Sequence, residues 1–169
     1  DPREGELTRS PGHVLLGGLL EYLGYRVDYF AVDGHLPGRR FDELYAGVVV
    51  WMTSGAPAQA GQFRRFLQAR LDEGTRIAFF GGMPVDDARL LARLGLRRLP
   101  YEPSEVSLKQ VDAALVGSFE APLRLRARDL LALSADESRL KPALQLQDDQ
   151  SNLLTPVATA DWGGYALAP

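Results

Sequence analysis

Two short apolar runs, joined by one amphipathic segment, constrain the fold of this chain more than any other feature. Residues 48–52 read Val-Val-Val-Trp-Met, and residues 77–80 read Ile-Ala-Phe-Phe. Strands that are apolar at every position are typical of a parallel sheet that is covered on both faces. Between them, apolar residues recur at helical spacing before Gly74: Phe63, Phe66, Leu67 and Leu71. This order predicts a strand, a crossover helix and a parallel strand.

Helix signals on both sides extend this α/β pattern. Ser10 and Pro11 are typical of a helix start, and Gly24 is typical of the end of the Leu-rich helix that follows. Residues 25–32 are predicted as a strand. Residues 85–94 are predicted as a helix with Asp86 and Asp87 in its first turn. We therefore expect an α/β fold with a mostly parallel sheet.

The pattern becomes β-rich near Pro100. Residues 123–128 and residues 144–147 alternate between apolar and polar side chains, as strands with one buried face do. Gly163 and Gly164 lie between two strand-like segments, which indicates a tight hairpin. The second half of the chain is thus expected to extend the sheet or to lie against its edge.

Length and composition place limits on domain number and function. The 169 residues suit a single domain, with an α/β half at 1–99 and a β-rich half at 100–169. The net charge of −3 gives no basic face for nucleic acid, and no apolar stretch is long enough to span a membrane. The absence of Cys excludes disulfides, thiolate catalysis and Cys-based metal sites. Two distant His residues, His13 and His35, predict no metal site, and no cofactor is expected.

A candidate ligand crevice follows from the expected topology, because ligands of open α/β sheets bind beyond the carboxyl ends of the strands. The start of the first helix and the turns after both apolar runs should meet there, and they contain His13, Thr53, Ser54, Gly81, Gly82 and Met83. The alternative is structural: Thr53 and Ser54 cap the next helix, and the glycines form a tight turn. A further alternative makes Ser54 a nucleophile with His13 as its base.

A second cluster lies near the end of the chain, at Asp161, Trp162 and Tyr165. Aromatic rings beside glycines can stack on sugar rings, which would make this cluster a carbohydrate contact. The alternative is that the rings pin a hairpin or pack against a neighbouring domain.

Several segments resemble one domain of the large periplasmic Pel exopolysaccharide hydrolase/deacetylases of biofilm-forming bacteria. They are Ser10-Pro-Gly-His13, Leu23-Gly-Tyr-Arg-Val-Asp28, Tyr45-Ala-Gly-Val-Val-Val-Trp51-Met, Ala78-Phe-Phe-Gly81-Gly82-Met-Pro84 and Asp161-Trp-Gly-Gly-Tyr165. The resemblance implies a periplasmic multidomain protein with a glycoside hydrolase domain upstream and a de-N-acetylase domain downstream. It also implies a three-layer, flavodoxin-like fold similar to class I glutamine amidotransferases, with a strand before the first helix. Residues 1–9 are too polar to supply that strand well.

The chain departs from an amidotransferase at the residues that would catalyse. Gly81, Gly82 and Met83 stand where the nucleophilic Cys would be, and no His follows His35. The chain lacks an initiator Met and ends within strand-like sequence, so we expect a piece of a larger protein. Any hydrolase or deacetylase activity would then belong to the parent protein.

The expected function is a non-catalytic scaffold domain between the domains of a polysaccharide-modifying protein of biofilm exopolysaccharide biosynthesis. Its partners would be the neighbouring domains of the same polypeptide. The first alternative is a carbohydrate-binding module for an amino-sugar polymer. The second alternative is a Ser54-dependent esterase.

Overall fold

The computed structural model describes residues 9–38, 41–53, 56–84, 86–100, 103, 105–112, 124–126 and 132–167. In chain order its helices are the π-helical segment η3 (His13–Gly17), α1 (Gly18–Tyr22), α2 (Phe41–Leu44), α3 (Ala60–Asp72) and α4 (Ala88–Arg93). Its strands are β1 (Gly47–Met52), β2 (Arg76–Gly81), β3 (Leu96–Arg98), β4 (Glu105–Val111), β5 (Arg124–Arg126), β6 (Leu133–Ala135), β7 (Leu140–Asp148), β8 (Leu153–Ala160) and β9 (Gly163–Leu167). We refer to η3 and α1 together as the first helix.

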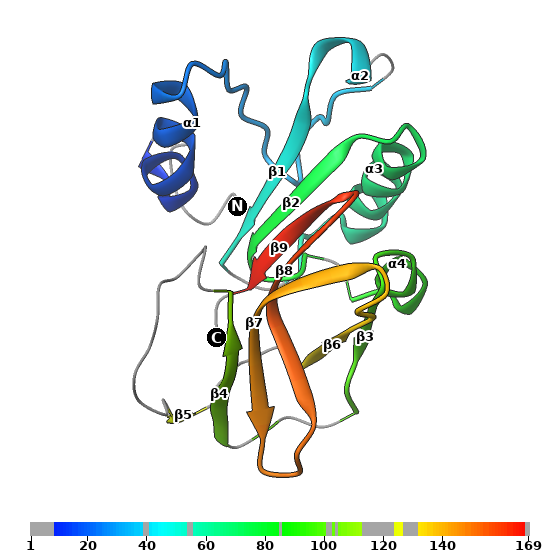
Figure 1. The fold of residues 1–169 in the computed structure, drawn as a ribbon. Helices are drawn as coiled ribbons and strands as arrows, with labels where there is room; N and C mark the ends of the chain where they lie inside the picture. The colour runs from blue at the N-terminus through cyan, green and yellow to red at the C-terminus, as the bar shows by residue number, and fades with distance from the viewer. Residues whose placement is uncertain are drawn as a thin grey trace.

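The main sheet is mixed, which corrects the prediction of a mostly parallel sheet. Its strand order is β1-β2-β9-β8-β7-β4-β5, and a separate small sheet pairs β3 with β6 (Figure 1). Only the β1–β2 and β2–β9 pairs are parallel among these described strands; the rest are antiparallel. The physical reason is the connection of β8 to β9 through residues 161–162, because two residues can join only antiparallel neighbours.

The position of β1 also differs from the expectation of a central strand that is covered on both faces. β1 is the outermost strand of the sheet and pairs only with β2. Val50 and Met52 are buried, whereas Val49 on the opposite face is 46% exposed. Residues 25–31, within the predicted strand at 25–32, form no ladder and leave the outer edge of β1 without a neighbouring strand.

Helices α3 and α4 cover one face of the parallel strands. Phe63 and Leu67 of α3 and Leu90 of α4 join Val50 and Phe79 in the larger apolar core. The first helix lies on the other side of β1 (Figure 1). In the described residues it covers the opposite face only near Trp51, where a Cβ at Gly12 would lie 3.0 Å from the indole ring. The layers of a full three-layer fold are therefore only partly formed in the described residues.

Most local start and end signals are confirmed. Ser10 Oγ accepts a hydrogen bond from His13 N at 3.2 Å, and Gly24, with φ of 91°, follows the first helix. Gly74 follows α3 with φ of 76°. The prediction that Asp86 and Asp87 lie in the first turn of a helix was wrong, because both precede α4. Asp87 is the N-cap, and its side chain accepts from Leu90 N.

The β-rich second half is confirmed, and it contributes a second core. The long hairpin of β7 and β8 turns at Asp148, whose Oδ1 accepts from Gln150 N and Asn152 N. Leu146 and Leu154 on this hairpin belong to a smaller cluster, while Leu140 and Ala158 on the same strands belong to the larger core. The hairpin thus connects the two cores.

Candidate functional site

The turns after β1 and β2 meet at one edge of the sheet, as the expected topology requires. Met52 O accepts a hydrogen bond from Gly82 N at 2.6 Å. Gly81 has φ of 82°, and a Cβ there would lie 2.1 Å from Met52 O and 3.7 Å from Thr53 Cγ2. These glycines allow the two strand ends to approach each other closely. The packing of these strand ends therefore explains the two glycines without a ligand.

The start of the first helix reaches the same edge. Gly12 packs on the ring of Trp51, which stacks on Phe80 with ring centroids 6.3 Å apart. The Trp51 Nε1 atom is buried and has no hydrogen-bond partner in the part of the chain that the structure describes. The described residues therefore leave one indole donor unsatisfied beneath the helix start.

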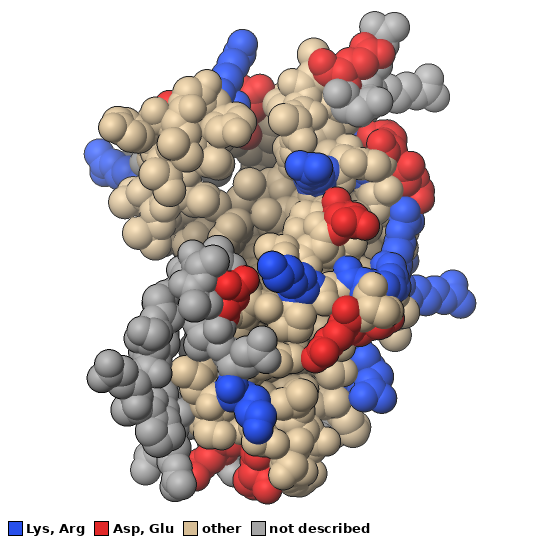
Figure 2. Space-filling model, in the orientation of Figure 1, with Lys and Arg blue, Asp and Glu red and all other residues tan. Residues whose placement is uncertain are grey.

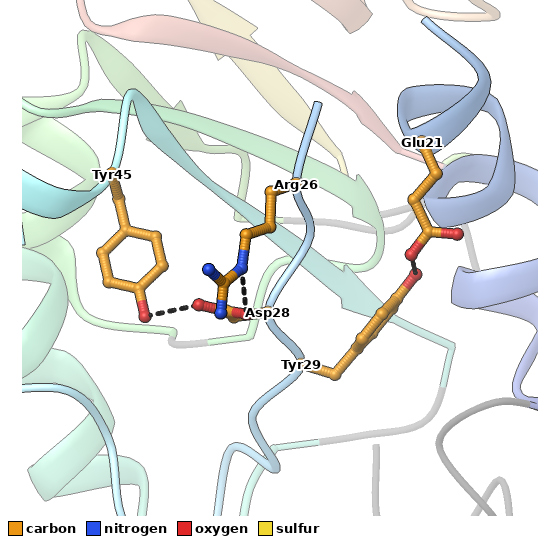
Figure 3. Close-up of polar contacts among 5 residues, drawn as sticks. All are labelled: Glu21, Arg26, Asp28, Tyr29 and Tyr45. Atoms are coloured by element: carbon orange, nitrogen blue, oxygen red, sulfur yellow. Dashed lines mark hydrogen bonds and ion pairs between the residues drawn. The ribbon is translucent and has the colours of Figure 1, made fainter. Parts of the chain in front are cut away.

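His13, the candidate base, takes part in a hydrogen-bonded chain with Tyr29 and Glu21. His13 Nδ1 lies 2.6 Å from the Tyr29 oxygen, and the Tyr29 hydroxyl donates to Glu21 Oε1 at 3.3 Å (Figure 3). Burial raises the pKa of Tyr29, and the Glu21 carboxylate raises it further. Because the Tyr29 proton is given to Glu21, the Tyr29 oxygen accepts from Nδ1–H of His13. This pairing fastens the first helix to residues 26–30.

The remaining residues of the candidate crevice do not assemble a catalytic group in the described structure. Thr53 is exposed, and Met83 is half-buried against the larger core. Ser54 lies outside the described residues, so the hypothesis of a Ser54 nucleophile is neither supported nor contradicted. In the described residues, the turns that follow β1 and β2 offer main-chain groups and the Thr53 hydroxyl.

The second predicted cluster is built into the core. Tyr165 is buried, and its hydroxyl donates to Thr155 O at 2.8 Å; this burial raises the Tyr165 pKa. Trp162 is half-buried, its Nε1 donates to Leu94 O at 3.2 Å, and its ring contacts Phe79 edge to face. Asp161 is exposed beside them. The two rings pin the β8–β9 turn, and Tyr165 offers no surface on which a sugar could stack.

The largest unexpected feature is an exposed apolar surface on the first helix, which we call the α1 surface. Its five residues are between 53% and 87% exposed: Val14, Leu15, Leu19, Tyr22 and Leu23. Figure 2 shows few charged side chains on the lobe that holds this helix. A signal was present in the sequence, because the helix is apolar around most of its circumference, and such helices are normally buried.

Residues 26–30 are anchored to the start of β1 by polar contacts and ring contacts. Asp28 accepts a hydrogen bond from the Tyr45 hydroxyl at 2.9 Å and pairs with Arg26 at 3.6 Å (Figure 3). The bond to Asp28 raises the pKa of Tyr45. The ring of Phe30 also meets that of Tyr45 edge to face. This segment therefore stays close to β1 without pairing with it.

Within the described residues, no three His, Asp or Glu side chains are grouped so that they could hold a metal ion. None of the described helices has the length and apolar character needed to cross a membrane. Comparison of the chain with protein-family models, with curated protein sequences and with solved structures gave no match to any of them.

Proposed function

We propose that this chain is a non-catalytic scaffold domain that orients neighbouring domains of a periplasmic, Pel-like polysaccharide-modifying protein. The observation that supports a docking role is the α1 surface. The exopolysaccharide context and the periplasmic location rest on the sequence resemblance alone. A scaffold of this kind acts by fixing the distance and angle between two active sites that work on one polymer.

The energetics of the α1 surface favour a covering partner. Full burial of one Leu or Val side chain contributes about 1.5–3 kcal/mol. Val14, Leu15, Leu19 and Leu23 are each more than half exposed, so a partner that covers them gains several such contributions. Large exposed apolar patches on soluble proteins mark interaction sites.

An amidotransferase-like ancestry of the fold is part of the same proposal. The parallel β1–β2 pair with α3 between its strands is the unit that such a fold repeats. The Gly81–Gly82 turn occupies the place of the nucleophile elbow, and in this chain it serves close packing against Met52. A turn that has no nucleophile but still packs closely supports a structural role for the domain rather than a catalytic one.

Hydrogen exchange tests the docking role. We expect the amides of α1 to exchange at least tenfold more slowly in the complete polypeptide encoded by the gene than in the 169-residue chain. Leu19→Asp should abolish this protection, whereas Leu153→Asp, at an exposed apolar residue on β8, should leave it intact. Equal exchange of α1 in the two proteins would contradict the scaffold function.

Carbohydrate binding is the second candidate, and exposed aromatic rings favour it at a different place from the one expected. Tyr22 is 87% exposed and Tyr25 is 58% exposed. Such rings can stack on sugars. Titration with partially deacetylated hexosamine oligosaccharides should then shift the amide signals near both tyrosines, and the double change Tyr22→Ala with Tyr25→Ala should remove the shifts. A flat titration at millimolar sugar would eliminate this candidate.

A further inference from the structure

Along the outer edge of β1, main-chain groups have no strand partner among the described residues. Met52 O points toward β2, because it accepts from Gly82 N. Main-chain groups alternate sides along a strand, so those of Val48 and Val50 share this direction and those of Val49 and Trp51 point away from β2. No described strand lies on that side of β1. Val49 and Trp51 thus present two N–H and two C=O groups at an open edge.

A second stretch of backbone near this edge is also unpaired within the described part of the chain. Residues 26–30 belong to no helix or strand, and no main-chain hydrogen bond joins them to another described residue. Side-chain contacts hold this segment at two points. Asp28 is hydrogen-bonded to Tyr45 just before β1, and Tyr29 is hydrogen-bonded to His13 at the start of the first helix. Main-chain N–H and C=O groups that are left unpaired require water or another polypeptide segment as their partner.

The surface is hollowed between the lobe with the first helix and the body with β1 and β2 (Figure 2). Apolar side chains remain exposed on the neighbouring segments: Val49 is 46% and Phe30 is 43% exposed. The Trp51 Nε1 donor beneath the helix start is unsatisfied among the described residues as well. An open strand edge, exposed apolar side chains and unpaired donors therefore occur together.

We infer that the edge of β1 receives one extended, apolar, uncharged segment of the neighbouring domain, which adds to the sheet as a new strand; this inference rests on the proposed function. Only a polypeptide offers N–H and C=O groups at the spacing of a strand edge, about 3.3 Å per residue. An apolar, uncharged segment fits this edge because Gly47–Met52 holds no charged residue and because Val49 and Phe30 leave apolar side chains exposed. A charge placed there would be desolvated without a partner.

The probe for this inference is a lysine-flanked peptide with the β1 sequence Gly-Val-Val-Val-Trp-Met, added to the 169-residue chain. We expect it to slow amide exchange at Val49 and Trp51 by about tenfold or more, which is the effect of one or two added hydrogen bonds. The same peptide with N-methyl groups on alternate amides should give no protection, because its donors are blocked. Both measurements use the unaltered protein, so they do not depend on the folding of a variant.

Two variants at one position test the edge itself. Val49→Pro removes the outward N–H without touching the β1–β2 ladder and should weaken peptide binding by about tenfold, the effect of one lost hydrogen bond. Val49→Thr keeps the N–H and a branched side chain, so it should bind the peptide more tightly than Val49→Pro does. Unchanged exchange at Val49 and Trp51 with millimolar peptide, or equal binding of the N-methylated peptide, would overturn the inference.

The outcomes separate this inference from the proposed function. Peptide protection at β1 without protection of α1 in the complete polypeptide would refute the scaffold role, and with it the assignment of the strand to a neighbouring domain. Protection of α1 without any effect of the peptide at β1 would leave the scaffold role and refute the added strand.

Discussion

At the scale of single residues, close backbone approach explains features that resemble parts of an active site. Gly81 lies at the turn that ends β2. In this chain its missing side chain makes room for Met52 O, and its positive φ permits the turn. The backbone conformation of this turn therefore requires glycine at position 81, independently of any catalytic activity.

The first prediction compares two glycines with positive φ. Gly81→Ala combines left-handed strain with a clash on Met52 O, so we expect the free energy of unfolding to fall by at least about 2 kcal/mol. Gly74→Ala is the matched control, because φ is 76° there but no atom lies within 4 Å of the added Cβ. Its free energy of unfolding should fall by only about 1–2 kcal/mol, the cost of the left-handed backbone strain alone. Chemical denaturation measures both, and equal losses would show that the clash is relieved.

The second prediction concerns Asp87, which caps α4 and pairs with Arg64 at 2.6 Å. The bond from Leu90 N lowers the Asp87 pKa most, and Arg64 lowers it further. A carboxyl group whose pKa is lower in the folded state stabilises the fold at pH values above its unfolded pKa, which is near 3.9. This stabilisation is lost as the pH falls through the pKa of the folded state. Asp87→Asn should therefore be less stable than the unaltered chain at pH 7, and the difference should shrink as the pH falls through the lowered folded pKa of Asp87.

Thermal melts between pH 2.5 and pH 7 provide the measurement for Asp87. Asn retains the capping oxygen, so Asp87→Asn isolates the charge, while Asp87→Ala removes the cap as well. A difference between the Asp87→Asn variant and the unaltered chain that does not change with pH would refute the role of the charge.

At the scale of elements, one buried arginine joins α3 to the segment before β1. Arg70 is 5% exposed, donates to Gly38 O at 3.0 Å and pairs with Glu73 at 2.7 Å. Its guanidinium also lies over the rings of Phe41 and Phe66, 5.0 and 5.3 Å from their centroids. It therefore fixes α2 against α3 through several weak contacts that act together.

The third prediction replaces Arg70 with Lys and with Met. Lys keeps the charge, but it cannot stack on the two Phe rings or bind Gly38 O and Glu73 together. We therefore expect the free energy of unfolding to fall by about 1–2 kcal/mol. Met keeps the apolar stem and leaves Gly38 O without its donor, so the loss should reach about 2–3 kcal/mol. Denaturant titration measures stability, and limited proteolysis around Gly38 reports release of the segment. Unchanged proteolysis in both variants would show that Arg70 does not hold it.

At the scale of the whole molecule, the β7–β8 hairpin connects the two halves of the chain, so we expect them to unfold as one cooperative unit. Its strands contribute to both apolar cores, and β8 pairs with β9, which in turn lies against β2. A disturbance in the smaller core should therefore reach the α/β half through continuous strands.

The fourth prediction tests this coupling with Leu154→Ala in the smaller core, where Leu154 is 1% exposed. We expect a loss of about 2–5 kcal/mol, as for other buried Leu-to-Ala changes. Neither tryptophan belongs to the smaller core as described: Trp162 packs against the larger core, and Trp51 lies on β1 in the α/β half. Their fluorescence should nevertheless shift to the same lower midpoint as the far-UV circular dichroism. Two separate transitions would mean that the cores unfold independently.

The sequence by itself determined the local structure of this protein. Ser10, Gly24 and Gly74 mark helix starts and ends, because these depend on residues only a few positions apart. The hairpin near position 163 is also present, but its turn is at residues 161–162, and Gly163 and Gly164 belong to β9. The apolar runs at 48–52 and 77–80 correctly predicted β1 and β2 for the same reason. The meeting of the two turns at one sheet edge also followed, because parallel strands end together.

Only the tertiary structure decided which surfaces are covered. An apolar run reads the same at the centre of a sheet as at its edge, so nothing near 48–52 showed that β1 is outermost. Residues 25–32 have strand-like composition, yet residues 25–31 form no ladder, because a strand forms only with a neighbour, which can come from anywhere along the chain. The same reason applies to the α1 surface, to the burial of Tyr165 and to β9 between β2 and β8. Each depends on contacts between residues distant in sequence, which local patterns do not contain.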